Sequence, residues 1–200
     1  MWLVGELNIA HEHIPAGGAF GGLDQADFLA MNPHGRIPVI MDKDGTIVWE
    51  SHAILRYLAA QYGADLFWSV DAKKRATVDQ WMDWSQTTLQ PDFINGIFWA
   101  YYRTPESQRN WPLINANIKR VGEHLLLLDK ILAEHSYLTG NKISLADICI
   151  GTLLYRYFEL DIERPDIANV ENWYKQLQKR PAYREHVMIS FEDLKGRMGF

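Results

Sequence analysis

The spacing of apolar residues changes near Gly63, and this change limits the possible folds more than any other feature of the chain. Before it, two short β-rich runs at residues 37–41 and 46–49 flank a turn that contains Asp44-Gly45, which is typical of a β-hairpin. After it, apolar residues recur at intervals of three and four, which is typical of helices. The sequence therefore predicts a small α/β part followed by an all-helical part.

Further segments complete the predicted first domain, which we place at residues 1–62. Residues 9–14 alternate apolar and polar side chains and predict a strand, and residues 24–31 have the spacing of a helix. Ser51 is a good N-cap for a helix that Gly63 would end. We expect the boundary between the two domains at residues 63–70.

The second domain, which we place at residues 71–200, consists of predicted helices alone. The first covers residues 71–89, and Pro91 predicts a kink or a break after it. A long amphipathic helix follows, and Thr104-Pro105 resembles its start. Its apolar stripe comprises Ile114, Ile118, Val121, Leu125, Leu128 and Leu132.

Ser144-Leu145-Ala146-Asp147 opens a helix that is apolar nearly all round, which predicts a buried, central position. Its Ser-x-x-Asp start is a variant of the capping box. A shorter helix over residues 170–179 follows and ends at Arg180-Pro181.

The composition excludes several classes of protein. The net charge of −5 speaks against nucleic acid and anionic membranes as partners. Cys149 is the only cysteine, so no internal disulfide forms and a reducing compartment is expected. The apolar run in residues 1–6 is too short for a signal peptide or a membrane span. We therefore expect a cytoplasmic protein.

Three motifs together resemble a known family. They are Asn-Pro-His-Gly-Arg-Ile-Pro-Val-Ile at residues 32–40, Trp-Glu-Ser-His-Ala-Ile at residues 49–54, and Gly140 followed by the Ser144-x-x-Asp147 helix start. Over essentially the whole chain, this pattern resembles a cytosolic glutathione S-transferase of the bacterial type. The resemblance implies a thioredoxin-like N-terminal domain, an all-α C-terminal domain and a homodimer. It also implies glutathione as co-substrate, a small hydrophobic electrophile as second substrate, and no metal.

The resemblance assigns glutathione-binding roles to four residues of the first domain. A cis bond before Pro38 would turn the backbone of Ile37 outward, to pair with the cysteinyl backbone of glutathione. Ser51, at a helix N-terminus, would bind the γ-glutamyl carboxylate, and Glu50 its ammonium group. Arg36 would pair with the glycine carboxylate. Each residue also has a purely structural alternative. Pro38 would only begin a strand, Glu50 and Ser51 would only end a strand and cap a helix, and Arg36 would only be a solvated arginine in a turn.

Residues of the second domain receive other roles. Ser144 and Asp147 are expected to be structural, as the capping box of the central helix, and Cys149 to be a packing residue. In the resembled fold, part of the 71–102 region lines the pocket for the electrophile. This part of the resemblance singles out Trp84, Phe98 and Tyr101, for which an ordinary place in the core is the alternative.

His11 and His13 lie two apart on the predicted strand and share a face, which allows a metal site, but no third ligand is evident in the sequence. A solvated pair of histidines is the expected outcome.

The N-terminus departs from the resembled pattern. Family members begin with a strand and a loop that carries Ser, Tyr or Cys, whereas residues 1–8 here read as the end of the helix that follows them. We expect that roughly 10–15 residues are absent, that residues 9–14 lack their main strand partner, and that no residue can be named as the activator of the thiol. Our hypothesis is that the reading frame was assigned to start too late or that the chain was shortened. The alternative is a natural variant that lacks the residue that activates the thiol. The codons upstream of Met1 distinguish the two, because an in-frame stop directly before Met1 would contradict the hypothesis.

The expected function is the conjugation of the glutathione thiolate to small electrophiles. A non-catalytic glutathione-binding or interaction module on the same fold is one alternative. A glutathione-dependent isomerase, dehalogenase or peroxidase is another.

Overall fold

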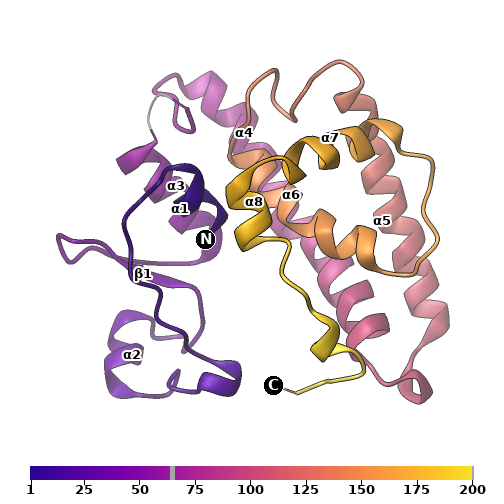
Figure 1. The fold of residues 1–200 in the computed structure, drawn as a ribbon, viewed down its shortest axis with the longest axis horizontal. Coiled ribbons are helices and arrows are strands. Elements are labelled where there is room, and N and C mark those ends of the chain that lie inside the picture. Colours follow the sequence, from indigo (N-terminus) through magenta and orange to yellow (C-terminus); the bar gives the residue numbers. More distant parts are fainter. Residues whose placement is uncertain (64–65, 200) are drawn as a thin grey trace.

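Two groups of elements lie beside each other in the computed structural model, which describes residues 1–63 and 66–199 (Figure 1). The N-terminal group, drawn in indigo and purple, holds the strands. The remaining elements are helical and form the larger group. Among the described residues, no helix is long and apolar enough to cross a membrane.

The predicted hairpin is present in the N-terminal group. Strands β1 (Val39–Met41) and β2 (Ile47–Trp49) pair antiparallel, with Val39 opposite Trp49. Gly45 has a φ of +86°, which a residue without a side chain adopts at little cost. Helices α1 (Trp2–Glu6), α2 (Ala26–Met31) and α3 (Ser51–Tyr62) complete this group, together with a 3-10 turn at Gly18–Phe20.

The predicted strand at residues 9–14 is wrong. Within the described part of the chain, the sheet consists of β1 and β2 alone, and residues 9–14 join neither of them. A strand exists only where its N–H and C=O groups meet those of a neighbour, and alternation of side chains supplies no such neighbour. Residues 1–8 agree better with the prediction, since they contain the short helix α1.

Of the kink or break predicted at Pro91, the break is wrong, because the backbone remains helical from Ala72 to Arg103. Helix α4 (Ala72–Trp84) passes into wider π-helical turns at Ser85–Leu89 and then at η3 (Pro91–Arg103). Gln90 between them keeps helical dihedral angles, with φ −63° and ψ −48°. Pro91 is the first residue of η3 and has no N–H to donate to the preceding turn, and π-helical turns lie on both sides of Gln90-Pro91.

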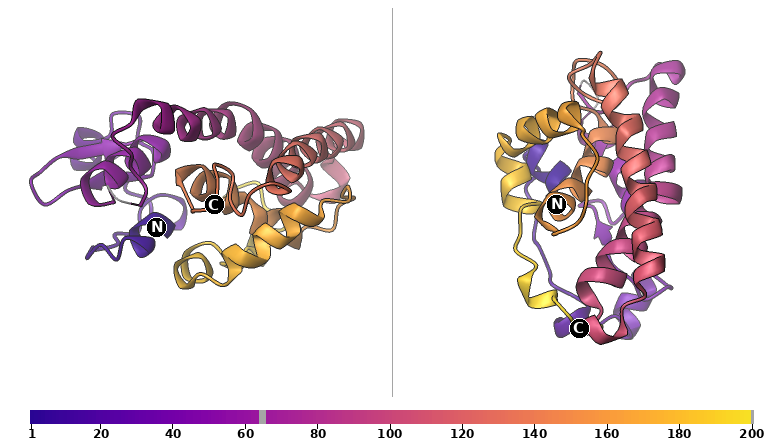
Figure 2. Two further views of the ribbon diagram at one scale, coloured as in Figure 1. Left: turned by 90° about the horizontal axis from the view of Figure 1, so that it is seen from above. Right: turned by 90° about the vertical axis from the view of Figure 1, so that its right-hand side faces the viewer.

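The long amphipathic helix begins later than predicted. Helix α5 (Trp111–Leu132) starts after Asn110, whose side chain accepts a hydrogen bond from the Leu113 N–H at 3.2 Å. Thr104-Pro105 instead precedes a short 3-10 turn at Glu106–Gln108. Figure 2 shows α5 running beside the long segment formed by α4 and η3. The chain continues through α6 (Leu145–Glu159), α7 (Ala168–Gln178), α8 (Pro181–His186) and a 3-10 turn at Glu192–Leu194.

Helix α6 occupies the centre of the helical group, as its apolar sequence predicts. A Cβ atom on Gly151 would lie 2.7 Å from Leu177 Cδ1 of α7 and 3.2 Å from the Trp2 ring of α1. The glycine therefore allows three helices from distant parts of the sequence to meet. Glu6 of α1 and Arg180, directly before α8, form a partly buried ion pair near this junction, with Oε1 to Nε at 2.7 Å and Oε2 to Nη2 at 2.5 Å.

Candidate functional site

A cavity of about 680 Å³ lies between the N-terminal group and the helical group. One wall comes from α1, the loop at residues 13–20, the segment around β1, and α3. The other wall comes from the start of η3, from α6 and from α8. Its volume falls within the usual range for small-molecule sites, which is about 300–1,000 Å³.

Ile37 and Pro38 line this cavity, and the peptide bond that joins them is cis. The Ile37 side chain is 55% exposed. Among the described residues, neither the N–H nor the C=O of Ile37 has a hydrogen-bond partner. An extended peptide could therefore pair with this backbone as one strand pairs with another.

Ser51 lines the same cavity at the first turn of α3. The first intrahelical hydrogen bond there runs from the Ile54 N–H to the Glu50 C=O, at 2.9 Å. The N–H groups of the preceding turn are thus available to an anion, and the positive end of the helix dipole favours one.

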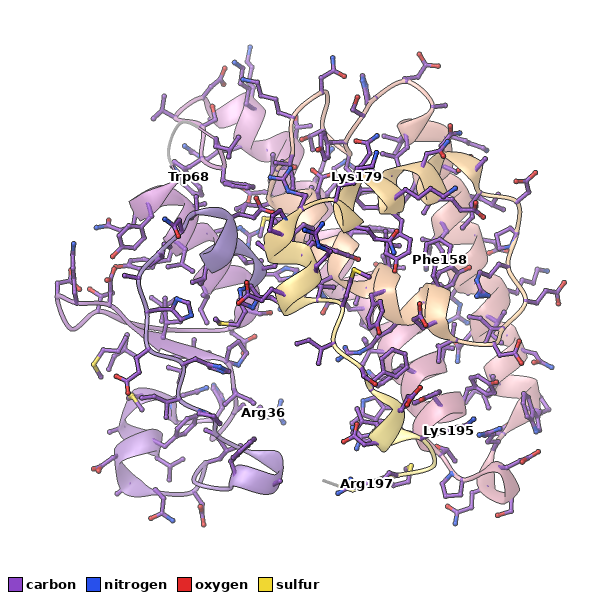
Figure 3. The ribbon with its side chains drawn as sticks, viewed as in Figure 1. Arg36, Trp68, Phe158, Lys179, Lys195 and Arg197 are labelled. Carbon is purple, nitrogen blue, oxygen red and sulfur yellow. The ribbon has the colours of Figure 1, made fainter. Side chains whose placement is uncertain are left out.

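Glu50, the residue before α3, has a φ of +67° and a ψ of +120°. Residues with a Cβ atom rarely adopt such angles, which cost about 1–3 kcal/mol and concentrate at functional sites. Glu50 is exposed, next to the cavity-lining Ser51 but outside the lining itself. Arg36 is also exposed, and it precedes the cavity-lining Ile37 without lining the cavity itself. In the view of Figure 3 it lies on the edge of the N-terminal group that faces the helical group.

None of the three aromatic residues singled out from the sequence lines the cavity. The Trp84 ring contacts His124 of α5 edge-on, at 5.5 Å between centroids. The buried Phe98 stacks on Tyr102, and the Tyr101 hydroxyl donates to the Asp161 C=O at 3.0 Å.

The same helical stretch does reach the cavity, but through Gln90 and Ile94, one turn apart at the start of η3. Trp84, Phe98 and Tyr101 therefore stay a prediction for the electrophile pocket and lie outside the wall of this cavity.

Several polar residues in the cavity wall were missed by the sequence reasoning. His52 is buried, and its Nε2 lies 3.3 Å from Gln90 Nε2. Burial, reinforced by the positive charge of Arg56, lowers the pKa of His52. Arg156 also belongs to the wall. One signal could have identified it, because an arginine on a helix that is apolar nearly all round is unusual.

The capping box at the start of α6 is present. Asp147 is fully buried and accepts hydrogen bonds from the Ser144 N–H at 2.8 Å, the Ser144 hydroxyl at 2.9 Å and the Leu138 N–H at 3.0 Å. Burial raises the pKa of Asp147 to about 6. These contacts tie the loop before α6 to its first turn.

Cys149 is buried in the same helix and forms part of the cavity wall. Burial raises the pKa of its thiol to about 12, so the thiolate is scarcely populated at neutral pH. His11 and His13 are both exposed. Within the ranges that the structure describes, no group of three potential ligands could hold a metal ion.

Comparisons with known proteins agree on one family. Residues 1–61 match the model of the glutathione S-transferase N-terminal domain, and residues 91–181 match that of the C-terminal domain. The chain is 40% identical over 185 residues to glutathione S-transferase GstB of Escherichia coli, which covers 92% of this chain and 88% of that protein. Glutathione S-transferase D6 of Drosophila melanogaster is 32% identical over 164 residues, or 80% of this chain and 72% of that one.

A comparison with solved structures indicates the same family. The theta class glutathione S-transferase of Xanthomonas axonopodis pv. citri, solved with glutathione bound, superposes with a TM-score of 0.87 at 40% sequence identity. The match covers 94% of this chain and 90% of that one. With its small α/β part, its helical part and the cis-proline cavity between them, the chain belongs to the bacterial cytosolic glutathione S-transferase family.

Proposed function

We propose that the protein is a glutathione transferase that conjugates the glutathione thiolate to small electrophilic substrates. The observation that carries this proposal is the unpaired Ile37 backbone at a cis-proline, in one cavity with the N-terminus of α3. This pair of features offers a strand-like partner and an anion site to one extended peptide with a terminal carboxylate.

Four residues would hold glutathione. The Ile37 N–H and C=O would pair with the cysteinyl backbone, and the Ser51 hydroxyl and N–H would bind the γ-glutamyl carboxylate. The Glu50 carboxylate would pair with the ammonium group, and the strained backbone of Glu50 supports a functional reason for its position. Arg36, exposed beside Ile37, would pair with the glycine carboxylate.

The electrophile would occupy the part of the cavity walled by the helical group. This wall is mainly apolar and includes Ile94, Ile148 and Leu153. In the reaction, the thiolate sulfur forms a bond to the electrophilic carbon, and the leaving group departs with its bonding electron pair. The thiol proton passes to solvent.

We further propose a cytoplasmic homodimer with domains at residues 1–62 and 71–200. The single, buried Cys149 suits a reducing compartment. The family supports dimerisation, and sedimentation equilibrium measures it directly.

Calorimetry and a transfer assay test the proposal together. Glutathione is titrated into the wild-type chain, into Glu50→Ala and into Glu123→Gln, a control at an exposed glutamate on α5. Conjugation to 1-chloro-2,4-dinitrobenzene is then followed by absorbance. We expect binding and turnover by the wild type, about tenfold weaker binding by Glu50→Ala and no change in Glu123→Gln.

The possible contrary results separate the alternatives. Binding of glutathione without transfer to any electrophile would contradict the transferase and support the non-catalytic module. Equal binding by Glu50→Ala would remove the assigned role of Glu50. Absence of binding by the wild type would exclude both functions for the chain as it stands.

A further inference from the structure

The described part of the cavity wall has a positively charged side chain but no negatively charged one. Among the described residues, the lining includes one arginine, Arg156, but no lysine, no aspartate and no glutamate. The remaining titratable groups of the wall are three histidines, the Cys149 thiol and the Met1 amino group. Arg156 is therefore the one side chain of the wall that is charged at every physiological pH.

Among the described residues, the guanidinium of Arg156 contacts an aromatic ring and no carboxylate. Arg156 follows Cys149 and Thr152 along the same face of α6, and all three line the cavity. Its guanidinium lies 5.0 Å from the centre of the Phe98 ring. Within the described part of the chain, no carboxylate pairs with it and no acceptor takes a hydrogen bond from it.

Other arginines of the chain differ in this respect. Arg180 pairs with Glu6, and Arg56 pairs with both Asp79 and Asp83. Burial, followed by the positive charge of Arg103, lowers the pKa of Arg156. A partly desolvated cation without a counter-ion is costly to keep in a folded protein. The environment is thus suited to an anion that arrives from outside.

We propose that Arg156 binds an anionic group of the second substrate, so that this transferase prefers electrophiles that carry a carboxylate or sulfonate. The inference rests on the proposed function and gives its substrate class. Ile37 and Ser51 stand on the opposite, N-terminal wall, where glutathione is placed, whereas Arg156 belongs to the helical wall. The anionic group therefore comes from the second substrate rather than from glutathione.

A binding experiment tests the charge of the cavity independently of catalysis. The matched probes are 3-nitrobenzoate and 3-nitrobenzamide, which share a ring and differ in charge, and quenching of tryptophan fluorescence reports their binding. We expect the wild type to bind the benzoate more tightly. Arg156→Met should weaken benzoate binding roughly 10- to 100-fold, the effect of losing one charged hydrogen-bonding partner, and leave the benzamide unchanged. Arg156→Lys should retain part of the preference.

Arg109→Met is the matched control. The Arg109 guanidinium lies 4.8 Å from the centre of the Tyr101 ring, an aromatic contact like that of Arg156, but Arg109 does not line the cavity. This variant should bind both probes as the wild type does. If Arg156→Met fails to fold, the salt dependence of the wild type decides. Added salt should weaken binding of the benzoate and spare the benzamide.

A transfer assay separates this inference from the proposed function. The substrates are 4-chloro-3-nitrobenzoate and 4-chloro-3-nitrobenzamide, in which sulfur replaces chloride at the ring carbon and chloride leaves with the bonding pair. We expect Arg156→Met to raise KM for the benzoate alone. Transfer to the benzamide without any preference for the benzoate would overturn the inference and leave the transferase intact.

Two other results would decide as clearly. If glutathione affinity falls in Arg156→Met while the benzoate binds as before, Arg156 serves glutathione and the inference is wrong. If neither electrophile reacts but the benzoate preference depends on Arg156, the anion site stands and the transferase proposal fails.

Discussion

The backbone strain at Glu50 predicts that stability and binding respond in opposite directions to one substitution. Glu50 has a φ of +67° and a ψ of +120°, which a residue with a Cβ atom adopts at a cost of about 1–3 kcal/mol. Glycine removes this cost. It also adds backbone entropy to the unfolded chain, which offsets about 0.5–1 kcal/mol of the gain.

We therefore expect Glu50→Gly to raise the free energy of unfolding by about 0.5–2 kcal/mol over Glu50→Ala, which keeps the Cβ atom and the strain. Both variants lack the carboxylate, so both should bind glutathione about tenfold more weakly than the wild type. Urea denaturation followed by tryptophan fluorescence gives the stability, and calorimetry gives the affinity.

Gly45→Ala measures the cost of backbone strain independently, because it adds a Cβ atom at a positive φ, whereas Glu50→Gly removes one. Gly45 has a φ of +86°, and a Cβ atom there would meet nothing within 4 Å, so Gly45→Ala measures strain without a clash. We expect this variant to lose about 1–2 kcal/mol of stability. If Gly45→Ala is destabilised as expected while Glu50→Gly is no more stable than Glu50→Ala, the strain assigned to Glu50 is refuted.

Two further predictions concern a partly buried ion pair and a buried thiol. Burial alone would raise the pKa of Glu6, but hydrogen bonds from Arg180 and Trp2 hold it below the usual value. Glu6→Gln should therefore lower the free energy of unfolding by about 2 kcal/mol at pH 7. In urea titrations, the difference between the variant and the wild type should shrink as the pH falls below about 4, because Glu6 then becomes protonated. A difference that stays constant with pH would contradict the stabilising role of the Glu6 charge. Because burial raises the pKa of Cys149 to about 12, iodoacetamide should label the native thiol at pH 8 roughly 1,000-fold more slowly than the thiol unfolded in urea, and similar rates by mass spectrometry would show that the thiol is accessible.

Local residue chemistry was sufficient to predict the hairpin, helix α3 and the capping box. The turn with Asp44-Gly45 between β-rich runs predicts two paired strands, and β1 and β2 are found there. Gly63 is the C-cap of α3, as predicted. The predicted N-cap is wrong by one residue, because Ser51 is the first residue of the helix and Glu50 is its N-cap, without a side-chain hydrogen bond. These features depend on contacts between residues that are close in sequence, and so the sequence alone contains their physical cause.

The motifs also predicted the cis bond before Pro38, which the structure has. Ile37, Pro38 and Ser51 meet in one cavity because a single short hairpin joins them, and the glutathione-binding roles of Ile37 and Ser51 stay predictions. Trp84, Phe98 and Tyr101 lie outside the wall of this cavity, and their role in an electrophile pocket stays a prediction. A periodic row of aromatic residues shows that a helix has an apolar face, but it does not show which neighbour covers that face.

Tertiary structure alone decided the remaining features. Residues 9–14 alternate like a strand, yet no neighbouring strand supplies partners for their backbone. Gln90 and Ile94 reach the cavity from the start of η3, and the packing of α6 against the N-terminal group places Arg156 in the cavity wall, where the described residues provide no counter-ion. Local sequence determined most of the helices and the hairpin. The cavity and its charge arise only when segments more than 100 residues apart come together. The reason is that burial and electrostatic pairing depend on distance in space and not on distance along the chain.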